Sequence, residues 1–216
     1  MLMLQDKNNR ETVEVSVASE RAEAIGGVLI ALFAALMAIS QMVNGELEEE
    51  MMIAHNNVVS YSSWYQSKSI KESLKESELD YLAALIESGI VTDDKVPVIN
   101  QKIVEVKEKI IKYEAEKTEI LLGSVKVGKE NWVQDIEGEM GIITGVKEWE
   151  QLTQTYDYAT KRFDYALLFY QICIVLGAVC IIIYDNPKLQ KGLIVLMIIF
   201  GITGTFLSVY GYLLAP

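Results

Sequence analysis

The chain has 216 residues, of which 51% are hydrophobic and 23% are charged, and its mean hydropathy is +0.23. An ordinary soluble domain is less apolar than this, so the apolar and the charged residues must be segregated along the chain. The formal net charge of −11 disfavours binding to nucleic acid, whose phosphates require a surface of Lys and Arg. We therefore expect no nucleic-acid partner.

Residues 1–24 contain no sustained apolar period, and we predict a short N-terminal tail there. Three segments downstream lack Asp, Glu, Lys and Arg, namely residues 25–43, 166–184 and 192–214, which are 19, 19 and 23 residues long. At about 1.5 Å per residue each helix spans about 28–35 Å, the thickness of a hydrocarbon core. These lengths predict three transmembrane helices. The first segment exceeds the core of about 7–15 residues of a secretory signal, so we expect an anchor.

Both cysteines, Cys173 and Cys180, lie in the second apolar segment, seven residues apart. On a helix their Cα atoms are about 10 Å apart, which is too far for a disulfide between them. The cysteines therefore say nothing about the compartment.

The segment of residues 44–165 is predicted to be an acidic extramembrane domain, with 24 acidic and 14 basic residues between Gly45 and Tyr165. No Gly or Pro occurs from Glu46 to Ser88. Apolar residues recur there in steps of four and three, which is the pattern of a helix that buries one seam: Leu47, Met51, Ala54, Val58, Tyr61 and Tyr65, then Leu79, Leu82 and Ile86. The same register passes through Lys68, Glu72 and Lys75. The seam is therefore polar there, or changes face to Ile70 and Leu74.

A turn and a returning helix follow this first arm. Gly89 and Pro97 supply a helix stop and a restart. The returning arm, residues 98–122, has a regular seam of 4-3 spacing: Ile99, Ile103, Val106, Ile110, Tyr113, Lys117 and Ile120. The two arms predict a helical hairpin that forms a coiled-coil stalk.

A glycine-rich excursion at residues 123–146 interrupts the returning arm. The outgoing arm has 43 residues, and the returning pieces 98–122 and 147–165 have 44 together, so the arms match if the excursion leaves the stalk and rejoins it. The excursion contains Trp132, Ile142 and Ile143, with Trp149 just after it. A small packed lobe, or a surface for a neighbouring subunit, would use these residues. We expect helix to resume near Val146 and to continue into the second crossing.

These segments define the expected fold class, an all-α integral membrane protein with three transmembrane helices and a long helical hairpin between the first and the second. A short turn, residues 185–191, joins the last two crossings.

Two local motifs carry a resemblance to a known family. The first runs from Ala54 to Lys71 and contains Asn56, Trp64, Tyr65, Gln66, Lys68, Ser69 and Lys71. The second is Arg162-Phe163-Asp164, directly before the second crossing. With these motifs the chain resembles the domain of unknown function 4337 family, bacterial three-pass membrane proteins. The resemblance covers most of residues 20–214, and the glycine-rich excursion departs from it. It implies a bacterial plasma membrane and no assigned activity.

No constellation of residues indicates an enzyme, a cofactor site or a metal site. His55 is the only histidine, and a nitrogen and sulfur metal site needs three or four ligands. A triad of His55 with Ser60 or Ser62 lacks a nucleophile elbow, and the glycines of the excursion lack the Lys-Ser or Lys-Thr that closes a phosphate-binding loop. We expect no catalytic residue, no cofactor and no metal.

The acidic cluster of Glu46, Glu48, Glu49 and Glu50 is the sharpest charge feature. It could collect divalent cations at a membrane mouth, or it could only keep the helix in water. We favour the second reading, because one helix cannot turn four such carboxylates toward one ion.

Small residues mark one face of each predicted crossing, and small side chains let helix backbones approach closely in lipid. The predicted packing residues are Gly27, Ala31 and Ala35 in the first crossing, Gly177 in the second, and Gly201, Gly204 and Ser208 in the third.

Basic residues near the membrane predict the orientation. Lys7, Arg10 and Arg21 precede the first crossing, and Lys188 and Lys191 lie in the short turn. The positive-inside rule then places the N-terminus and the turn in the cytoplasm and the stalk outside, with Lys161 and Arg162 as the opposing signal.

The leading functional hypothesis is a non-enzymatic membrane scaffold or stalk protein that forms a homo-oligomer through its coiled-coil arms and its transmembrane helices. The alternative is a subunit of an oligomeric channel with the glutamates as its vestibule. An extracytoplasmic enzyme that uses His55 ranks last.

Overall fold

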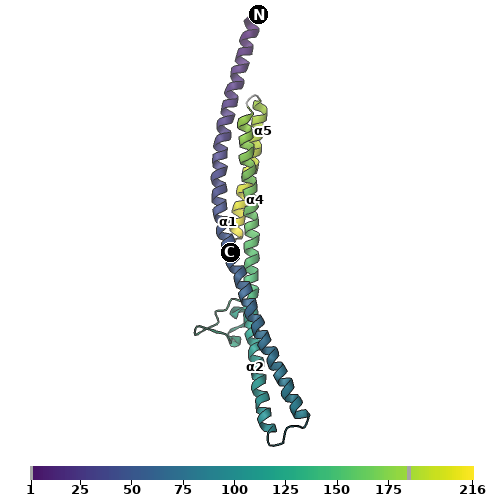
Figure 1. Cartoon of the computed structure of the whole chain (residues 1–216). Coiled ribbons are helices and arrows are strands. Elements are labelled where there is room, and N and C mark those ends of the chain that lie inside the picture. Colours follow the sequence, from purple (N-terminus) through teal and green to yellow (C-terminus); the bar gives the residue numbers. More distant parts are fainter. Residues whose placement is uncertain (1, 184–185) are drawn as a thin grey trace. The chain divides into compact units, whose positions relative to one another are not determined.

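The computed structural model describes the backbone of residues 2–183 and 186–216, and the side chains of residues 19–183 and 186–216. Its long helices are α1 (Leu2–Glu87), α2 (Val96–Leu122), α4 (Val146–Ile182) and α5 (Pro187–Leu214), shown in Figure 1. The expectation of an all-α protein with long helices is thereby confirmed. The chain divides into a membrane unit, residues 1–51 and 155–216, and a stalk unit, residues 52–154.

Helix α1 begins at Leu2 and continues without a break to Glu87. It therefore includes residues 2–24, which we described from the sequence as a tail. The physical reason is that no Gly or Pro occurs before Gly26, so nothing in this stretch ends a helix. Periodicity could not find this helix, because its residues show no apolar stripe.

The hairpin between α1 and α2 has the boundaries that the turn residues predict. Helix α1 ends at Glu87, and Gly89 follows with a φ of +69°, in the left-handed region that favours glycine. Helix α2 begins at Val96, with Pro97 in its first turn, where a missing N–H costs nothing. The two helices run antiparallel beside each other (Figure 1).

Helix α4 begins at Val146, as expected, and runs to Ile182 in one piece. Helix α5 begins at Pro187, so it already occupies part of the predicted turn 185–191. Asn186 caps it by accepting a hydrogen bond from the Leu189 N–H at 3.2 Å. Residues 184 and 185, where the predicted second crossing meets the predicted turn, lie outside the described residues.

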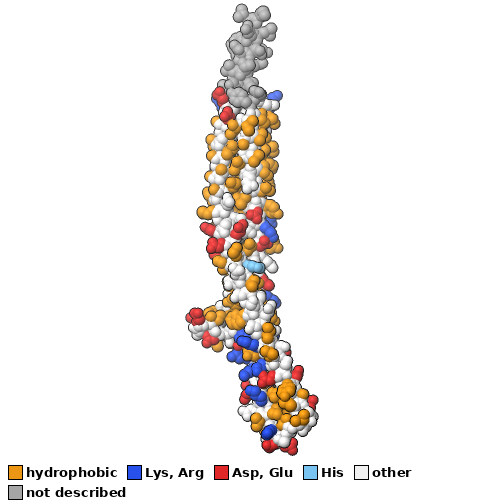
Figure 2. Space-filling view, in the orientation of Figure 1, with side chains coloured by type: hydrophobic (Ala, Val, Ile, Leu, Met, Phe, Trp, Pro, Cys, Tyr) orange, Lys and Arg blue, Asp and Glu red, His pale blue; other side chains and the backbone are white. Residues whose placement is uncertain are grey.

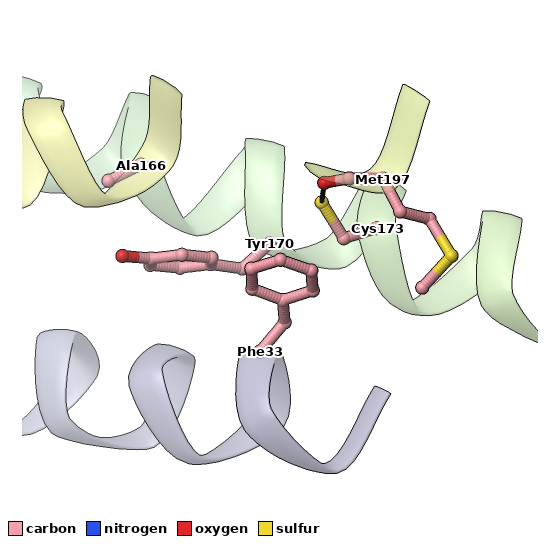
Figure 3. Close-up of a cluster of buried hydrophobic side chains, with 5 residues drawn as sticks. All are labelled: Phe33, Ala166, Tyr170, Cys173 and Met197. Carbon is pink, nitrogen blue, oxygen red and sulfur yellow. Dashed lines mark hydrogen bonds between the residues drawn. The ribbon is translucent and has the colours of Figure 1, made fainter. Parts of the chain in front are cut away.

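Helices α1, α4 and α5 bury a common cluster in the membrane unit: Phe33, Ala166, Tyr170, Cys173 and Met197 (Figure 3). The rings of Phe33 and Tyr170 stack with their centroids 6.3 Å apart. The Cys173 thiol donates a hydrogen bond to the Met197 carbonyl at 3.2 Å, and both cysteines are free. The prediction that Cys173 and Cys180 form no disulfide is confirmed.

Replacing Gly201 by Ala should destabilise the membrane unit, because the new methyl group would collide with the Phe33 ring. Overpacking of this kind costs about 1–3 kcal/mol. Thermal unfolding in detergent measures the effect. The matched control on the same helix is Gly192→Ala, since a Cβ at Gly192 meets no atom within 4 Å. Equal unfolding temperatures for the two variants would show that Phe33 does not fill the space above Gly201.

Candidate functional site: the packing faces of the helices

Glycines of α4 and α5 provide the space in which the membrane helices touch. A Cβ at Gly201 would strike Phe33 of α1, and one at Gly177 would lie 2.8 Å from Met197 Cε. A Cβ at Gly204 would lie 3.1 Å from the Tyr170 ring. The structure therefore brings Gly177, Gly201 and Gly204 together at the contacts between helices, which is the use we predicted for small residues.

Hydroxyl groups join the same three helices. Ser208 Oγ lies 2.9 Å from Ser40 Oγ, and the Tyr170 hydroxyl donates to Thr205 Oγ1 at 3.2 Å. A polar contact between helices in lipid is worth only about 0.6 kcal/mol on average. These bonds therefore fix the rotation of α1 and α5 about their axes more than they stabilise the unit.

The predicted packing residues of α1 do not lie at these contacts between the helices of one chain. Ala31 and Ala35 are exposed, and a Cβ at Gly27 meets no atom within 4 Å. Within the chain α1 packs through Phe33 and Ser40, which are seven residues apart and both buried. The small-residue rule could not choose between these faces, because α1 carries Gly and Ala on several sides. That Gly27, Ala31 and Ala35 pack against a helix of another chain stays a prediction.

The motif Arg162-Phe163-Asp164 joins α4 to its two neighbours in the membrane unit. The Asp164 carboxylate accepts a hydrogen bond from Asn44 Nδ2 of α1 at 3.3 Å. The Phe163 ring covers Gly211 of α5, where a Cβ would lie 3.0 Å away. The Arg162 guanidinium lies 5.8 Å from the centroid of the Tyr210 ring, a cation–π distance. Each residue of the motif therefore holds helices together.

The first motif lies on α1 in the stalk unit, where it faces α2. Lys68 forms an ion pair of 2.6 Å with Glu116, and Lys117 forms one with Glu72. The Lys117 ammonium also lies 5.9 Å from the centroid of the Tyr65 ring. The hydrogen bond that the Lys117 ammonium donates to Glu72 outweighs desolvation and raises the pKa of Lys117. The polar part of the predicted seam is thus a set of paired charges between the two arms.

The other members of this motif divide by exposure. Trp64 packs edge-on against Tyr61 with the ring centroids 5.8 Å apart, and Ser69 is half-buried. Asn56, Gln66 and Lys71 are exposed. The inner seam keeps its register through the charged stretch, so Ile70 and Leu74 do not replace it but lie exposed on the other side of the helix.

The excursion forms a small lobe around a buried glutamate. It contains α3 (Ser124–Val127), the 3₁₀ helix η1 (Lys129–Asn131) and the antiparallel strands β1 (Asp135–Ile136) and β2 (Glu139–Met140). Glu119 of α2 is fully buried, and its carboxylate accepts hydrogen bonds from the Ser124 hydroxyl at 2.7 Å and from the N–H groups of Val133 and Gln134 at 2.9 Å. These three bonds attach the lobe to α2.

Trp132 and Gly141 close the lobe on its other side. The Trp132 ring occupies the place where a Cβ of Gly141 would stand, and its Nε1–H donates to the Ser124 carbonyl at 2.7 Å. Ile143 is buried, whereas Ile142 is exposed. The packed lobe expected from Trp132 and Ile143 is therefore present. The sequence pattern does not identify Glu119 as a buried residue, because a glutamate in a helix rich in Glu and Lys is usually solvated.

The carboxylates of the acidic cluster lie on the surface of α1. Glu46, Glu48, Glu49 and Glu50 are all exposed, and so is His55. In the described part of the chain, no group of three or more His, Cys, Asp or Glu residues could hold a metal ion.

Among the described residues, three helical segments are long and apolar enough to cross a membrane: Ser19–Glu87, Val146–Ile182 and Pro187–Leu214. Figure 2 shows hydrophobic side chains covering much of the face of the membrane unit. These properties indicate a helical membrane protein. The chain belongs to the domain of unknown function 4337 family (DUF4337), whose model matches residues 22–214. No curated protein and no solved structure matches the chain.

Replacing Glu119 by Leu should open the lobe, because the Val133 and Gln134 N–H groups and the Ser124 hydroxyl would lose their acceptor. Each buried group left without a partner costs about 1–3 kcal/mol. Hydrogen exchange should become faster at the Val133 and Gln134 amides, and trypsin should cleave sooner at Lys126 and Lys129. The control is Glu139→Leu on the exposed strand β2. If the Val133 and Gln134 amides exchange hydrogen at the same rate in the two variants, the carboxylate of Glu119 does not hold the lobe.

Proposed function

We propose that this protein is a non-enzymatic, self-associating membrane scaffold, or stalk protein. The observation that carries the proposal is a second apolar stripe on both helices of the stalk unit. On α1 it consists of Ile70, Leu74 and Tyr81, which are 63%, 63% and 64% exposed. On α2 it includes Val104 and Ile111, which are 55% and 66% exposed.

The spacing of these residues distinguishes them from scattered surface hydrophobics. Single exposed apolar residues are ordinary, but contiguous apolar surface marks a contact site. Ile70, Leu74 and Tyr81 are separated by four and seven residues, so they share one side of α1, and Val104 and Ile111 are seven residues apart on α2. Each arm therefore has one seam for its partner arm and one stripe that no side chain of the described hairpin covers.

The small face of α1 in the membrane unit supports the same proposal. Gly27, Ala31 and Ala35 leave space beside the backbone of α1: in the described part of the chain a Cβ at Gly27 meets no atom within 4 Å, and Ala31 and Ala35 are exposed. Such a face lets a helix of another copy approach closely in lipid. The proposed partners are thus the lipid bilayer and further copies of this chain.

The proposal predicts that the detergent-solubilised protein has a mass above that of one 24.2 kDa chain, and that the mass falls on dilution. Sedimentation equilibrium over a range of concentrations measures it. Changing Ile70 and Leu74 together to Ser should weaken association at least tenfold, or about 1.4 kcal/mol. The control changes Ser73 and Glu76 to Ala, which are exposed residues of α1 outside the stripe.

A monomeric mass at every concentration would overturn the proposal of a self-associating scaffold. Ion conductance in planar bilayers that changes selectivity when Glu48 and Glu50 are replaced by Gln would instead assign the protein to the channel class.

We further propose a bacterial plasma membrane location, with the N-terminus and the turn before α5 in the cytoplasm and the stalk outside. The resemblance to bacterial three-pass proteins supports the location. The distribution of Lys and Arg supports the orientation, since Arg21 precedes the first crossing and Lys188 and Lys191 lie at the start of α5.

Fusion of a reporter at Asp93, in the turn between α1 and α2, tests the orientation. Alkaline phosphatase fused there should be active, and a fluorescent protein fused there should be dark. The opposite result would place the stalk in the cytoplasm. A fusion after Pro216 should give the same result, because the second and third crossings return the chain to the side of the stalk. A fluorescent protein fused before Met1 is the control for the cytoplasmic side and should be fluorescent.

A further inference from the structure

The outer face of α2 is the side of this helix opposite its inner seam. The inner seam contains Val106 and Ile120, which are fully buried. The outer face consists of residues in steps of four and three, which is a second complete heptad pattern: Val104, Glu108, Ile111, Ala115, Thr118 and Leu122. Helix α2 is therefore built to pack on two opposite sides, and the hairpin uses one of them.

The end of the outer face nearest the lobe is hollowed. An open cavity of about 390 Å³ lies there, lined by Ile111, Glu114, Ala115, Thr118 and Leu122 of α2 and by Val127 and Asn131 of the lobe. The Thr118 hydroxyl already donates to the Glu114 carbonyl at 2.9 Å, so it needs no further partner. The groove thus offers mainly apolar surface to whatever fills it.

Four charged residues flank the outer face, and their signs alternate. In the heptad, Ile111 and Val104 are d positions, and Ala115 and Glu108 are a positions. Glu105 and Lys112 are then the e positions along one edge, and Lys107 and Glu114 are the g positions along the other edge. All four side chains are exposed. Charges at e and g set the partner and the orientation of coiled coils.

These charges are available to a partner. In the described part of the chain, Lys107 and Glu114 form no ion pair. Glu105 lies 3.2 Å from Lys102, and Lys112 lies 3.9 Å from Glu116, whose other oxygen is held by Lys68. Exposed pairs of this kind are worth about 0–1 kcal/mol, so they exchange readily for contacts to another chain.

We propose that the outer face of α2 binds the same face of a second copy, with the two α2 helices antiparallel and Val104 of each copy opposite Ala115 of the other. The inference rests on the proposed self-association and assigns its α2 contact a surface, an orientation and a register. Because an antiparallel pair reverses one copy, this contact joins copies in facing membranes or in detergent, and it is separate from the contact through Gly27, Ala31 and Ala35 within one membrane. Glu108 then stands opposite Ile111 of the second copy.

The flanking charges single out this arrangement. In it Glu105 faces Lys112 of the second copy and Lys107 faces its Glu114, and two-fold symmetry repeats both pairs. If one α2 helix slides along the other by one heptad in one direction, Lys112 of the first copy faces Lys112 of the second, and Glu114 faces Glu114. The shift in the other direction opposes Glu105 to Glu105 and Lys107 to Lys107. A parallel pair would set Lys107 against Lys112. Of these four arrangements, only the proposed one pairs opposite charges throughout.

Glu108 supplies a second reason for a defined register. It is the only charged residue of the outer face, and a polar residue at an a position fixes the alignment of two helices at a cost in stability. Replacing Glu108 by Leu should therefore tighten self-association and loosen its register.

A charge-reversal cycle in the full chain tests the proposal, with sedimentation equilibrium in detergent as the measurement. Glu105→Lys and Lys112→Glu should each weaken association at least tenfold, because each sets like charges together twice. The double variant should return the dissociation constant to within about threefold of the original. This rescue is specific, because residues 105 and 112 are about 10 Å apart within one helix and cannot pair there.

Lys71→Glu is the matched control, since Lys71 is exposed on α1 and forms no ion pair in the described part of the chain. The Lys71→Glu variant should self-associate with the same dissociation constant as the original protein. If Lys71→Glu weakens association while Lys112→Glu does not, the interface lies on α1 and the proposal is overturned.

Disulfide trapping tests the register directly. Val104→Cys and Ala115→Cys are made in separate, differently tagged chains, while the native Cys173 and Cys180 stay buried in the membrane unit. On mild oxidation, mixed chains should form the 104–115 disulfide, and neither variant alone should form a dimer. A disulfide between two copies of Val104→Cys would show parallel helices.

The outcomes separate this inference from the proposed function. Wild-type protein that is monomeric at all concentrations overturns both. Association that persists unchanged in every charge variant, without the 104–115 disulfide, overturns only the α2 interface.

Discussion

The membrane unit depends on close contact between helices at glycines. In a membrane, lipid would surround these helices with material as apolar as their own side chains, so burial of apolar surface would not drive them together. Shape and polar contacts must do so. The Phe33 ring on Gly201 is the most direct case, because a single methyl group at Gly201 would occupy the space of the ring. The bond between Ser40 and Ser208 then fixes α1 and α5 in rotation.

The stalk unit differs, since its helices carry many charged residues, and in water the hydrophobic effect would act on their apolar seam. Here the inner seam buries Val106 and Ile120, and the charged part of the seam is kept by the pairs Lys68–Glu116 and Lys117–Glu72. A half-buried charge is tolerated only beside its partner, so these pairs also oppose a slip of one arm along the other. Of the residues that carry the family resemblance on α1, Lys68 and Tyr65 take part in these contacts, whereas Asn56, Gln66 and Lys71 are exposed.

Apolar surface beyond the needs of one hairpin is what gives the stalk a proposed role. The inner seam alone accounts for the pairing of α1 with α2. Ile70, Leu74 and Tyr81 on α1, and Val104 and Ile111 on α2, lie outside that seam at helical spacing. Exposing them to water is unfavourable by about 25 cal/mol for each Å² of apolar surface, and in the proposed assembly a second copy of the chain would relieve that cost.

The sequence by itself determined the helical spans, the hairpin turn at Gly89 and Pro97, the restart of helix at Val146 and the separate character of the excursion. These follow from local rules, since the length of an uncharged run and the conformations open to Gly and Pro need no tertiary contact. Only the tertiary structure decided which side of α1 packs, because Gly and Ala occur on several sides of it and the choice depends on where Phe33 meets Gly201. It also decided that Glu119 is buried, because its partners Ser124, Val133 and Gln134 reach it only after the excursion has folded back onto α2.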